Sequence, residues 1–234
     1  MSRPALSHRA PRRLGALTVA VALSLLSHSA AAQESHRGVA LPDPRRQFDD
    51  SWFWGAKGGA MRFGTMLDGR VTAPLAGAEW MITRHHGALL VSAEQSFFDR
   101  TSMVADPSVA EGARTVSIKD ARRYSLAALA APKSFGWARP YAGLGLAIHV
   151  IRQATPEGRF TTQAQYDEVA DRVDAGQSLV APFALVGVQG QFGRFALFAQ
   201  GSASGEQTRS LWNRGGTSQV EAGLRYNVSS AFER

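Results

Sequence analysis

The chain has no cysteine among its 234 residues, which excludes disulfide bonds and thiolate metal sites. Beyond residue 32 it has no apolar run approaching 18 residues, so no transmembrane helix is expected there. It also lacks a strong charge of one sign. The formal net charge of +7 includes four arginines within residues 1–32, and without them 22 basic residues face 19 acidic ones. A balance of +3 gives no indication of nucleic-acid binding.

The first 32 residues have the three parts of a secretory signal peptide. Four arginines precede an apolar run from Leu14 to Leu26, and small residues follow up to Ala32. This run is shorter than the roughly 20 residues of a spanning helix. We predict cleavage after Ala32, with an uncleaved N-terminal anchor as the alternative. The polar residues 33–50 are predicted to be a flexible periplasmic lead-in, and residues 51–234 a single barrel domain.

From residue 51 onward, the chain consists of segments rich in glycine, alanine, aromatic and β-branched residues, separated by turn signals. Their length suits tilted strands that cross a bilayer. Because lipid offers no partner for free backbone groups, such strands must close into a barrel. We predict an all-β, eight-stranded antiparallel up-and-down transmembrane barrel with strands at 51–63, 75–83, 88–98, 117–131, 138–152, 179–192, 195–203 and 218–228.

The predicted connections alternate strictly between short and long. The short ones are 84–87, 132–137 and 193–194, and the long ones are 64–74, 99–116, 153–178 and 204–217. Outer-membrane barrels have this asymmetry, with short periplasmic turns and longer external loops. An even number of strands then places both ends of the barrel domain on the turn side. In the third long connection, apolar residues at helical spacing predict a short amphipathic helix that Thr162 begins and Gly176 ends, with a partly ordered loop as the alternative.

Within the strands, an apolar face alternates with a face of small or charged residues. This pattern alone fits a soluble barrel as well as a membrane barrel. Aromatic residues at the strand ends favour the membrane, because rings gather at its interfaces. Near the turns these are Trp52, Trp54, Trp80, Trp137, Phe192, Phe195 and Tyr226; near the loops they are Phe63, Phe97 and Phe98. Two hairpin registers agree with the alternation: Glu79 opposite Ser92, and Gly187 opposite Gln200.

The chain resembles the small eight-stranded outer-membrane barrels of the OmpA and OmpX type from about residue 51 to its end. The sharpest piece is the segment 221–228, in which Glu221, Gly223, Tyr226 and Val228 resemble the family's C-terminal insertion signal. Residues 139–145 resemble a recurring strand. The resemblance implies recognition by the barrel-assembly machinery. The chain departs from the family by continuing from Ser229 to Arg234, so the residue at which the last strand ends is not fixed by the resemblance.

An eight-stranded barrel is only just wide enough for its own side chains, so charges inside it need partners. Alternation places Glu79, Glu94 and Glu221 inside with Arg123 and Arg225, and with either Lys57 or Arg62. We predict that they form an ion-pair network that fills the lumen. His149 shares this face as a lumen-lining residue. His85 and His86 are predicted to be turn residues, and neither a metal site nor a cofactor is expected.

The leading hypothesis is a non-enzymatic, porin-like protein of the Gram-negative outer membrane, whose external loops serve envelope stability or surface interaction. Its partners would be outer-membrane lipid and lipopolysaccharide, with no nucleic acid, and the protein would be a monomer. Two alternatives stay open. A lipid-modifying enzyme requires an outward Ser–His pair near the loops, and a soluble lipocalin-like barrel requires an apolar interior.

Overall fold

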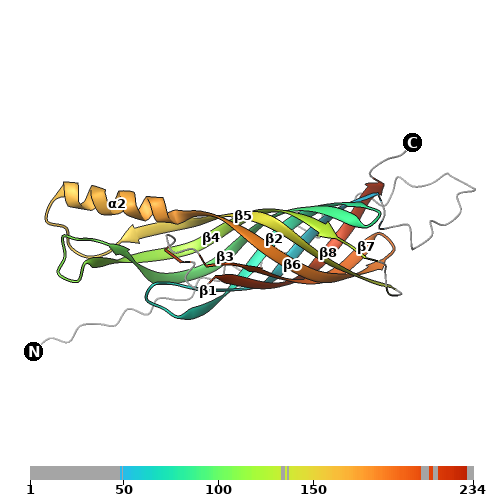
Figure 1. The fold of residues 1–234 in the computed structure, drawn as a ribbon, viewed down its shortest axis with the longest axis horizontal. Coiled ribbons are helices and arrows are strands. Elements are labelled where there is room, and N and C mark those ends of the chain that lie inside the picture. Colours follow the sequence, from blue (N-terminus) through green and yellow to red (C-terminus); the bar gives the residue numbers. More distant parts are fainter. Residues whose placement is uncertain are drawn as a thin grey trace, which may run out of the picture. The chain divides into compact units, whose positions relative to one another are not determined.

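The computed structural model describes residues 48, 50–132, 135, 137–206, 211–212 and 216–230, so the predicted signal peptide and nearly all of the lead-in lie outside the described residues. Within them the elements are β1 (Ser51–Gly64), β2 (Arg70–Arg84), β3 (Gly87–Ala105), β4 (Ala113–Ala130), β5 (Ala138–Pro156), α2 (Gln163–Gln177), β6 (Ser178–Phe192), β7 (Phe195–Ser204) and β8 (Thr217–Ser230). Each strand pairs antiparallel with the next, and β8 pairs with β1 (Figure 1). The predicted closed, eight-stranded up-and-down barrel is confirmed.

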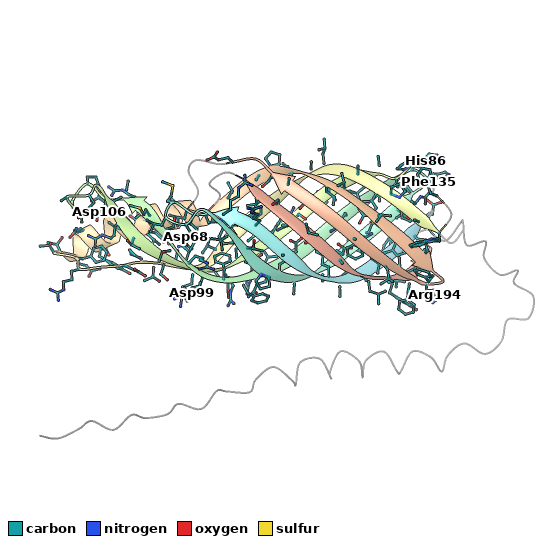
Figure 2. All side chains as sticks on the ribbon, turned by 90° about the horizontal axis from the view of Figure 1, so that it is seen from below. Asp68, His86, Asp99, Asp106, Phe135 and Arg194 are labelled. Carbon is teal, nitrogen blue, oxygen red and sulfur yellow. The ribbon has the colours of Figure 1, made fainter. Side chains whose placement is uncertain are left out.

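The two ends of the barrel differ as the sequence predicts. His86, Phe135 and Arg194 lie in the connections at one end, whereas Asp68, Asp99 and Asp106 lie toward the other (Figure 2). Both hairpin registers are confirmed, because Glu79 is the register partner of Ser92 and Gly187 that of Gln200. Ser51 pairs with Ser230, which places the first and last strand ends at the turn end.

Four strands, β2 to β5, extend well beyond their predicted limits, whereas the others match to within two residues. The predicted long loops are shorter as a result. β3 continues to Ala105 rather than 98, and β5 to Pro156 rather than 152. The pairing of β2 with β3 ends at Ser96, and that of β5 with β6 at Val150. Past these points, β3, β4 and β5 pair only with one another and continue beyond the barrel wall as a three-stranded extension, which we call the projecting sheet (Figure 1). Their backbone pairing persists where the apolar alternation used for the prediction has ended.

A bulge marks the start of this projection. The register of β3 against β4 shifts between Ser96 and Asp99. Opposite the shift, Asp120 has a φ of 51°, and its Oδ1 accepts a hydrogen bond from the N–H of Phe98 at 3.2 Å. Aspartate tolerates this backbone conformation because its short side chain bonds locally. Bulges bend strands, so this one separates the barrel wall from the projecting sheet.

The described helix confirms the predicted segment in the third loop. α2 spans Gln163–Gln177, and the hydroxyl of its N-cap residue Thr162 accepts a hydrogen bond from the N–H of Gln165 at 3.2 Å. Val169 and Val173 are buried because α2 lies along the projecting sheet beside β5 (Figure 1). Gly176 does not end the helix. Within the described ranges, no helix is both long and apolar enough to cross a membrane.

The barrel interior is not uniformly polar, because two apolar clusters lie within it. The cluster near the turns includes Phe53, Met81 and Phe183. The cluster near the loops includes Met61 and Phe63 in the lumen and continues onto the projecting sheet, where it includes Ile118. The prediction that Phe63 and Phe98 join an outer girdle is therefore wrong: Phe63 is 1% exposed, and its ring centroid lies 4.7 Å from that of Phe98. Continued alternation along β1 turns Phe63 inward, and the bulge turns Phe98 inward.

Inward glycines make room for the large side chains of the lumen. A Cβ placed on Gly187 would lie 2.5 Å from Cζ of Tyr141, whose hydroxyl donates to Oε1 of Gln200 at 2.9 Å. Gly187→Ala is therefore expected to lower the free energy of unfolding by about 1–3 kcal/mol through overpacking. Urea titration of the folded protein in lipid vesicles measures this loss.

The matched control for that substitution is Gly58→Ala on the outer face of β1. A Cβ there meets only the carbonyl oxygen of Leu75, at 3.7 Å. Since the new methyl group fits and a glycine is removed from a strand, stability should be unchanged or slightly raised. Equal losses for the two variants would contradict the placement of Tyr141.

Candidate functional site

The inner faces of β1, β2, β3 and β8 bring one lysine and three glutamates together midway along the lumen. The Nζ atom of Lys57 lies 2.6 Å from the Glu94 carboxylate, 3.1 Å from that of Glu221 and 3.7 Å from that of Glu79. All four side chains are almost inaccessible to solvent. Between the two candidates that alternation left open, the structure places Lys57 inside and leaves Arg62 exposed.

Two arginines complete this charged layer, which we define as Lys57, Glu79, Glu94, Arg123, Glu221 and Arg225. Arg225 is fully buried, and its Nε lies 2.5 Å from the Glu79 carboxylate. Arg123 donates through Nη1 to both oxygens of Glu94, each at 3.2 Å. Three cations thus face three carboxylates, so the charged layer is formally neutral.

Neutral side chains satisfy further hydrogen bonds of the charged layer. Gln200 donates through Nε2 to Glu221 at 2.7 Å, and Arg225 donates through Nη1 to Gln189 at 2.6 Å. Arg123 donates to Gln219 at 2.6 Å. The Arg225 guanidinium also stacks on the ring of Phe198, with its Cζ 3.9 Å from the ring centroid. Sequence analysis did not single out these residues for the network, although their position on the inward face was the available signal.

Toward the loop end, an aromatic side chain lies over His149. Trp212, from the connection between β7 and β8, is fully buried, and its ring centroid is 5.2 Å from that of His149 and 5.6 Å from that of Phe63. The neighbouring Leu211 accepts a hydrogen bond from the hydroxyl of Ser102 through its carbonyl oxygen. No periodic pattern in the sequence marks Trp212 as an interior residue, so sequence analysis missed it.

Toward the turn end, Phe48 is buried although it belongs to the predicted flexible lead-in. Its carbonyl oxygen accepts a hydrogen bond from the Thr83 hydroxyl, and the guanidinium of Arg139 lies 4.0 Å from its ring centroid. Phe53 packs beside it, with the ring centroids 6.1 Å apart. The flexible lead-in therefore does not extend to residue 48, because this ring packs into the apolar cluster near the turns.

The outer face of the barrel carries most of its large aliphatic side chains. Leu144 is 71% exposed and Val220 is 70% exposed, and this surface also includes Leu126, Leu146, Ile148, Val180, Val186, Val188, Leu197 and Leu224. A contiguous exposed surface of this kind is far too apolar for a soluble monomer. The charged layer is inside while these side chains are outside, which is the reverse of a soluble barrel.

Exposed aromatic rings surround the turn end of this apolar surface. Trp80 packs between Trp52 and Trp54, at centroid distances of 5.5 Å and 5.9 Å. Beside Trp54, its register partner Tyr226 has its ring centroid 5.2 Å from that of Phe195, and the centroids of Trp137 and Phe192 are 5.8 Å apart. The five residues predicted for the girdle, Trp52, Trp54, Trp80, Trp137 and Tyr226, thus lie at one end of the barrel.

The predicted insertion signal occupies β8 with the expected alternation. Glu221 and Gly223 are on the inner face, and Tyr226 and Val228 are exposed on the outer face. β8 continues to Ser230, and the final residues 231–234 lie outside the described part of the chain.

His85 and His86 form the tight turn between β2 and β3. His85 has a φ of 29°, and its carbonyl oxygen accepts a hydrogen bond from Arg139 at 3.4 Å. Among the described residues, no three histidine, aspartate or glutamate side chains are grouped as metal ligands would be.

A second buried ion pair lies in the projecting sheet, between Asp106 and Arg114. Arg114 donates through Nε to Asp106 at 2.7 Å and through Nη1 to the carbonyl oxygens of Glu157 and Arg159. Its guanidinium also stacks 4.0 Å from the ring centroid of Phe160. These contacts tie the connection after β3 to the segment that leads into α2. The sequence did not predict these contacts, because Asp106 and Arg114 both fell in a predicted loop.

The pKa of Asp106 is lowered from its ordinary value of 3.8 to about 2, by hydrogen bonds from Ser108 and then from Arg114. The hydrogen bonds favour the carboxylate form of Asp106 in the folded loop. Their contribution to stability is fully present above pH 3.8 and is lost as the pH falls through about 2. We expect pepsin to spare the 106–114 segment at pH 3.5 and to cleave it near pH 2. In Asp106→Asn this step should vanish. A step already complete near pH 3.8 in the unsubstituted protein would contradict the ion pair.

Comparison with known proteins supports this architecture through the fold of Neisserial surface protein A. No protein-family model and no curated protein sequence matches the chain. Neisserial surface protein A has a similar crystal structure, with a TM-score of 0.51 at 12% identity over 75% of this chain and 96% of that protein. OprG from Pseudomonas aeruginosa gives a TM-score of 0.43 at 9% identity over 77% and 98%. Ail from Yersinia pestis gives 0.41 at 12% identity over 76% and 99%. The likeness to Neisserial surface protein A concerns the fold alone, which is a small, closed, eight-stranded barrel in this chain.

Proposed function

We propose that the chain is an integral protein of the Gram-negative outer membrane, whose barrel anchors an extended external end. The observation that carries this proposal is the orientation of the side chains: aliphatic residues outside, bounded by aromatic rings at the turn end, and the charged layer inside. In lipid, an apolar outer face is favourable, and ionised groups are tolerated only when they are paired internally. Outer-membrane lipid and lipopolysaccharide would therefore surround the protein.

The proposed barrel is closed to ions and solutes. Three layers of side chains support this: the apolar cluster around Phe48, the charged layer, and the apolar cluster around Trp212. An eight-stranded barrel encloses little more volume than its own side chains occupy. The lumen charges then serve to hold the strands together, and no conductance is expected.

The proposed role is non-enzymatic and belongs to the external end, where the projecting sheet of β3, β4 and β5 supports α2. Binding functions commonly lie on loops that a rigid scaffold positions. The enzymatic alternative receives no support from His149, because its ring is buried on the inner face against Trp212, away from lipid. Surface interaction and envelope stability are thus the proposed functions, without a cofactor.

For biogenesis, we place the insertion signal in β8. Glu221, Gly223, Tyr226 and Val228 would be read by the barrel-assembly machinery while the strand is still unpaired. A monomer is proposed because β1 and β8 pair within one chain, which closes the barrel wall and leaves no open seam there for a second copy.

Membrane fractionation tests the proposal directly. We expect the protein in the outer-membrane fraction, with a faster-migrating folded band on cold electrophoresis that shifts on boiling. In planar bilayers, the purified protein should give no stepwise conductance. Recovery from the soluble periplasm would overturn the membrane location, and stable unitary currents would overturn the closed lumen.

A further inference from the structure

A small notch opens at the loop end of the barrel, at the seam between its first and last strands. The pairing of β8 with β1 ends at Arg62 and Ser218, but β1 continues to Gly64 along β2. The resulting cavity of about 180 Å³ is lined by Arg62, Arg70 and the hydroxyl-bearing Ser204, Thr217 and Ser218, among others. It therefore combines two cationic side chains with hydroxyl groups.

The two arginines lie side by side on the outer face of the β1–β2 pair. Arg62 is paired with Thr72, and Gly64 with Arg70, so the guanidinium groups extend from diagonal positions of the same face. Both side chains are exposed, and neither forms a hydrogen bond or an ion pair with another described residue. By contrast, two exposed cations of the projecting sheet are matched by carboxylates: Lys119 by Asp99 at 2.8 Å and Arg152 by Asp120 at 3.7 Å.

One hydroxyl of the notch lies on the same face as the arginines. Ser218 is the exposed register partner of Arg62, so its hydroxyl can donate beside the guanidinium groups. Ser204 and Thr217 lie on the inner face, where Oγ and Oγ1 are 2.6 Å apart and bond to each other. Glu206, the described carboxylate nearest in sequence to Ser204, makes no ion pair with Arg62 or Arg70.

The height of the notch places it at the surface of the bilayer. Ala60 is the next outward residue of β1 from Arg62 toward the turn end. It pairs with Val220, which is 70% exposed on the apolar face. Along β1, ten residues separate Trp52 in the aromatic girdle from Arg62, or about 25 Å across the membrane for a tilted strand. This distance matches the apolar band of a membrane barrel, so the arginines reach the headgroups of the leaflet at the loop end.

We propose that the notch binds the phosphate group of an outer-leaflet lipid, whose acyl chains lie along the apolar face below. Two guanidinium groups match the geometry and charge of a phosphate, and the exposed Ser218 hydroxyl is a further donor on the same face. The inference rests on the proposed outer-membrane location, because lipid headgroups lie level with the notch only when the barrel spans that membrane.

Lipid binding by the folded full-length protein in zwitterionic micelles tests the site. The probes are diphosphoryl lipid A, the same lipid with both phosphates removed, and inorganic phosphate. We expect Arg62→Gln and Arg70→Gln each to weaken diphosphoryl lipid A binding about tenfold, as expected for one lost charge-assisted hydrogen bond. The matched control is Arg122→Gln on β4, an exposed arginine outside the notch, which should leave the affinity within about twofold.

The dephosphorylated lipid should bind the protein and its notch variants equally weakly. Inorganic phosphate that binds as tightly as the phosphorylated lipid would overturn the assignment to a lipid. An equal effect of Arg122→Gln and Arg62→Gln would overturn the notch in favour of diffuse charge. If the notch variants keep full affinity while remaining heat-modifiable in the outer membrane, the notch inference fails and the proposed function stands.

Discussion

Lys57→Met is expected to lower the free energy of unfolding by about 3–5 kcal/mol, because it removes one partner from a buried network of charges. Glu79 and Glu94 would each keep an arginine partner, but Glu221 pairs with no cation other than Lys57 among the described residues. Its carboxylate would then be buried without a counter-charge. The substitution retains most of the side-chain volume, so lost packing contributes little.

Urea titration in lipid vesicles, with folded and unfolded bands separated on cold gels, measures this loss. The matched control is Lys119→Met, since Lys119 forms an exposed ion pair with Asp99. That variant should be close to the unsubstituted protein, because exposed pairs contribute little. The double variant Lys57→Met/Glu221→Gln should recover part of the loss by removing the orphaned charge. Equal stability of the two methionine variants would contradict the charged layer.

Leu146→Arg is expected to destabilise the barrel in lipid by about 2–4 kcal/mol, the cost of arginine on the lipid face near the bilayer midplane. Leu146 is 59% exposed on the outer face of β5, midway between the outward residues Pro140 and Arg152. The expected sign separates the two kinds of barrel. On a soluble barrel, the same exposed substitution would be tolerated and would raise solubility.

The control for this substitution is Leu67→Arg in the connection between β1 and β2, where Leu67 is 49% exposed but lies beyond the strands. It should leave the urea midpoint unchanged, because the new charge enters water. A Leu146→Arg variant as stable in vesicles as Leu67→Arg would show that β5 does not face acyl chains.

The strand count, the hairpin registers and the inward charges were predictable because they depend on local alternation. Side chains on a strand point to opposite faces with a period of two, so a tight turn at residues 84–87 fixes the face of Glu79 and Ser92. The same reasoning puts Glu221 and Arg225 inside. Lys57 and Arg62 are five residues apart and so lie on opposite faces of β1. They stayed alternatives because the glycine- and alanine-rich middle of this strand does not show which face is the inner one.

The remaining features depend on contacts that no local pattern records. Trp212 and Phe48 enter the lumen from irregular segments, whose side-chain directions are set by tertiary packing. The projecting sheet was missed because the ends of β3 and β5 have polar residues on both faces, and backbone pairing with neighbouring strands sustains them. The bulge before Asp99 changes the phase of alternation, so Phe98 was assigned to the wrong face.

The order of the layers in the lumen explains how the barrel can bury six charged side chains and stay rigid. The charged layer lies between two apolar clusters, which exclude water from both sides. Ion pairs are stronger in such surroundings, and each unpaired group is correspondingly more costly. A rigid barrel of this kind can hold the projecting sheet and α2 in a fixed position above the membrane.

Methyl-resolved NMR of the protein in lipid nanodiscs tests the central claim most directly, because it reports which leucines touch acyl chains. Nuclear Overhauser effects to acyl-chain protons are expected for the methyl groups of Leu144 and Leu146 on the outer face. They should be missing for Leu90 and Leu185, which are 3% exposed and lie inside the barrel. Acyl-chain contacts at Leu90 and Leu185, with none at Leu144 and Leu146, would contradict the orientation on which the proposed function depends.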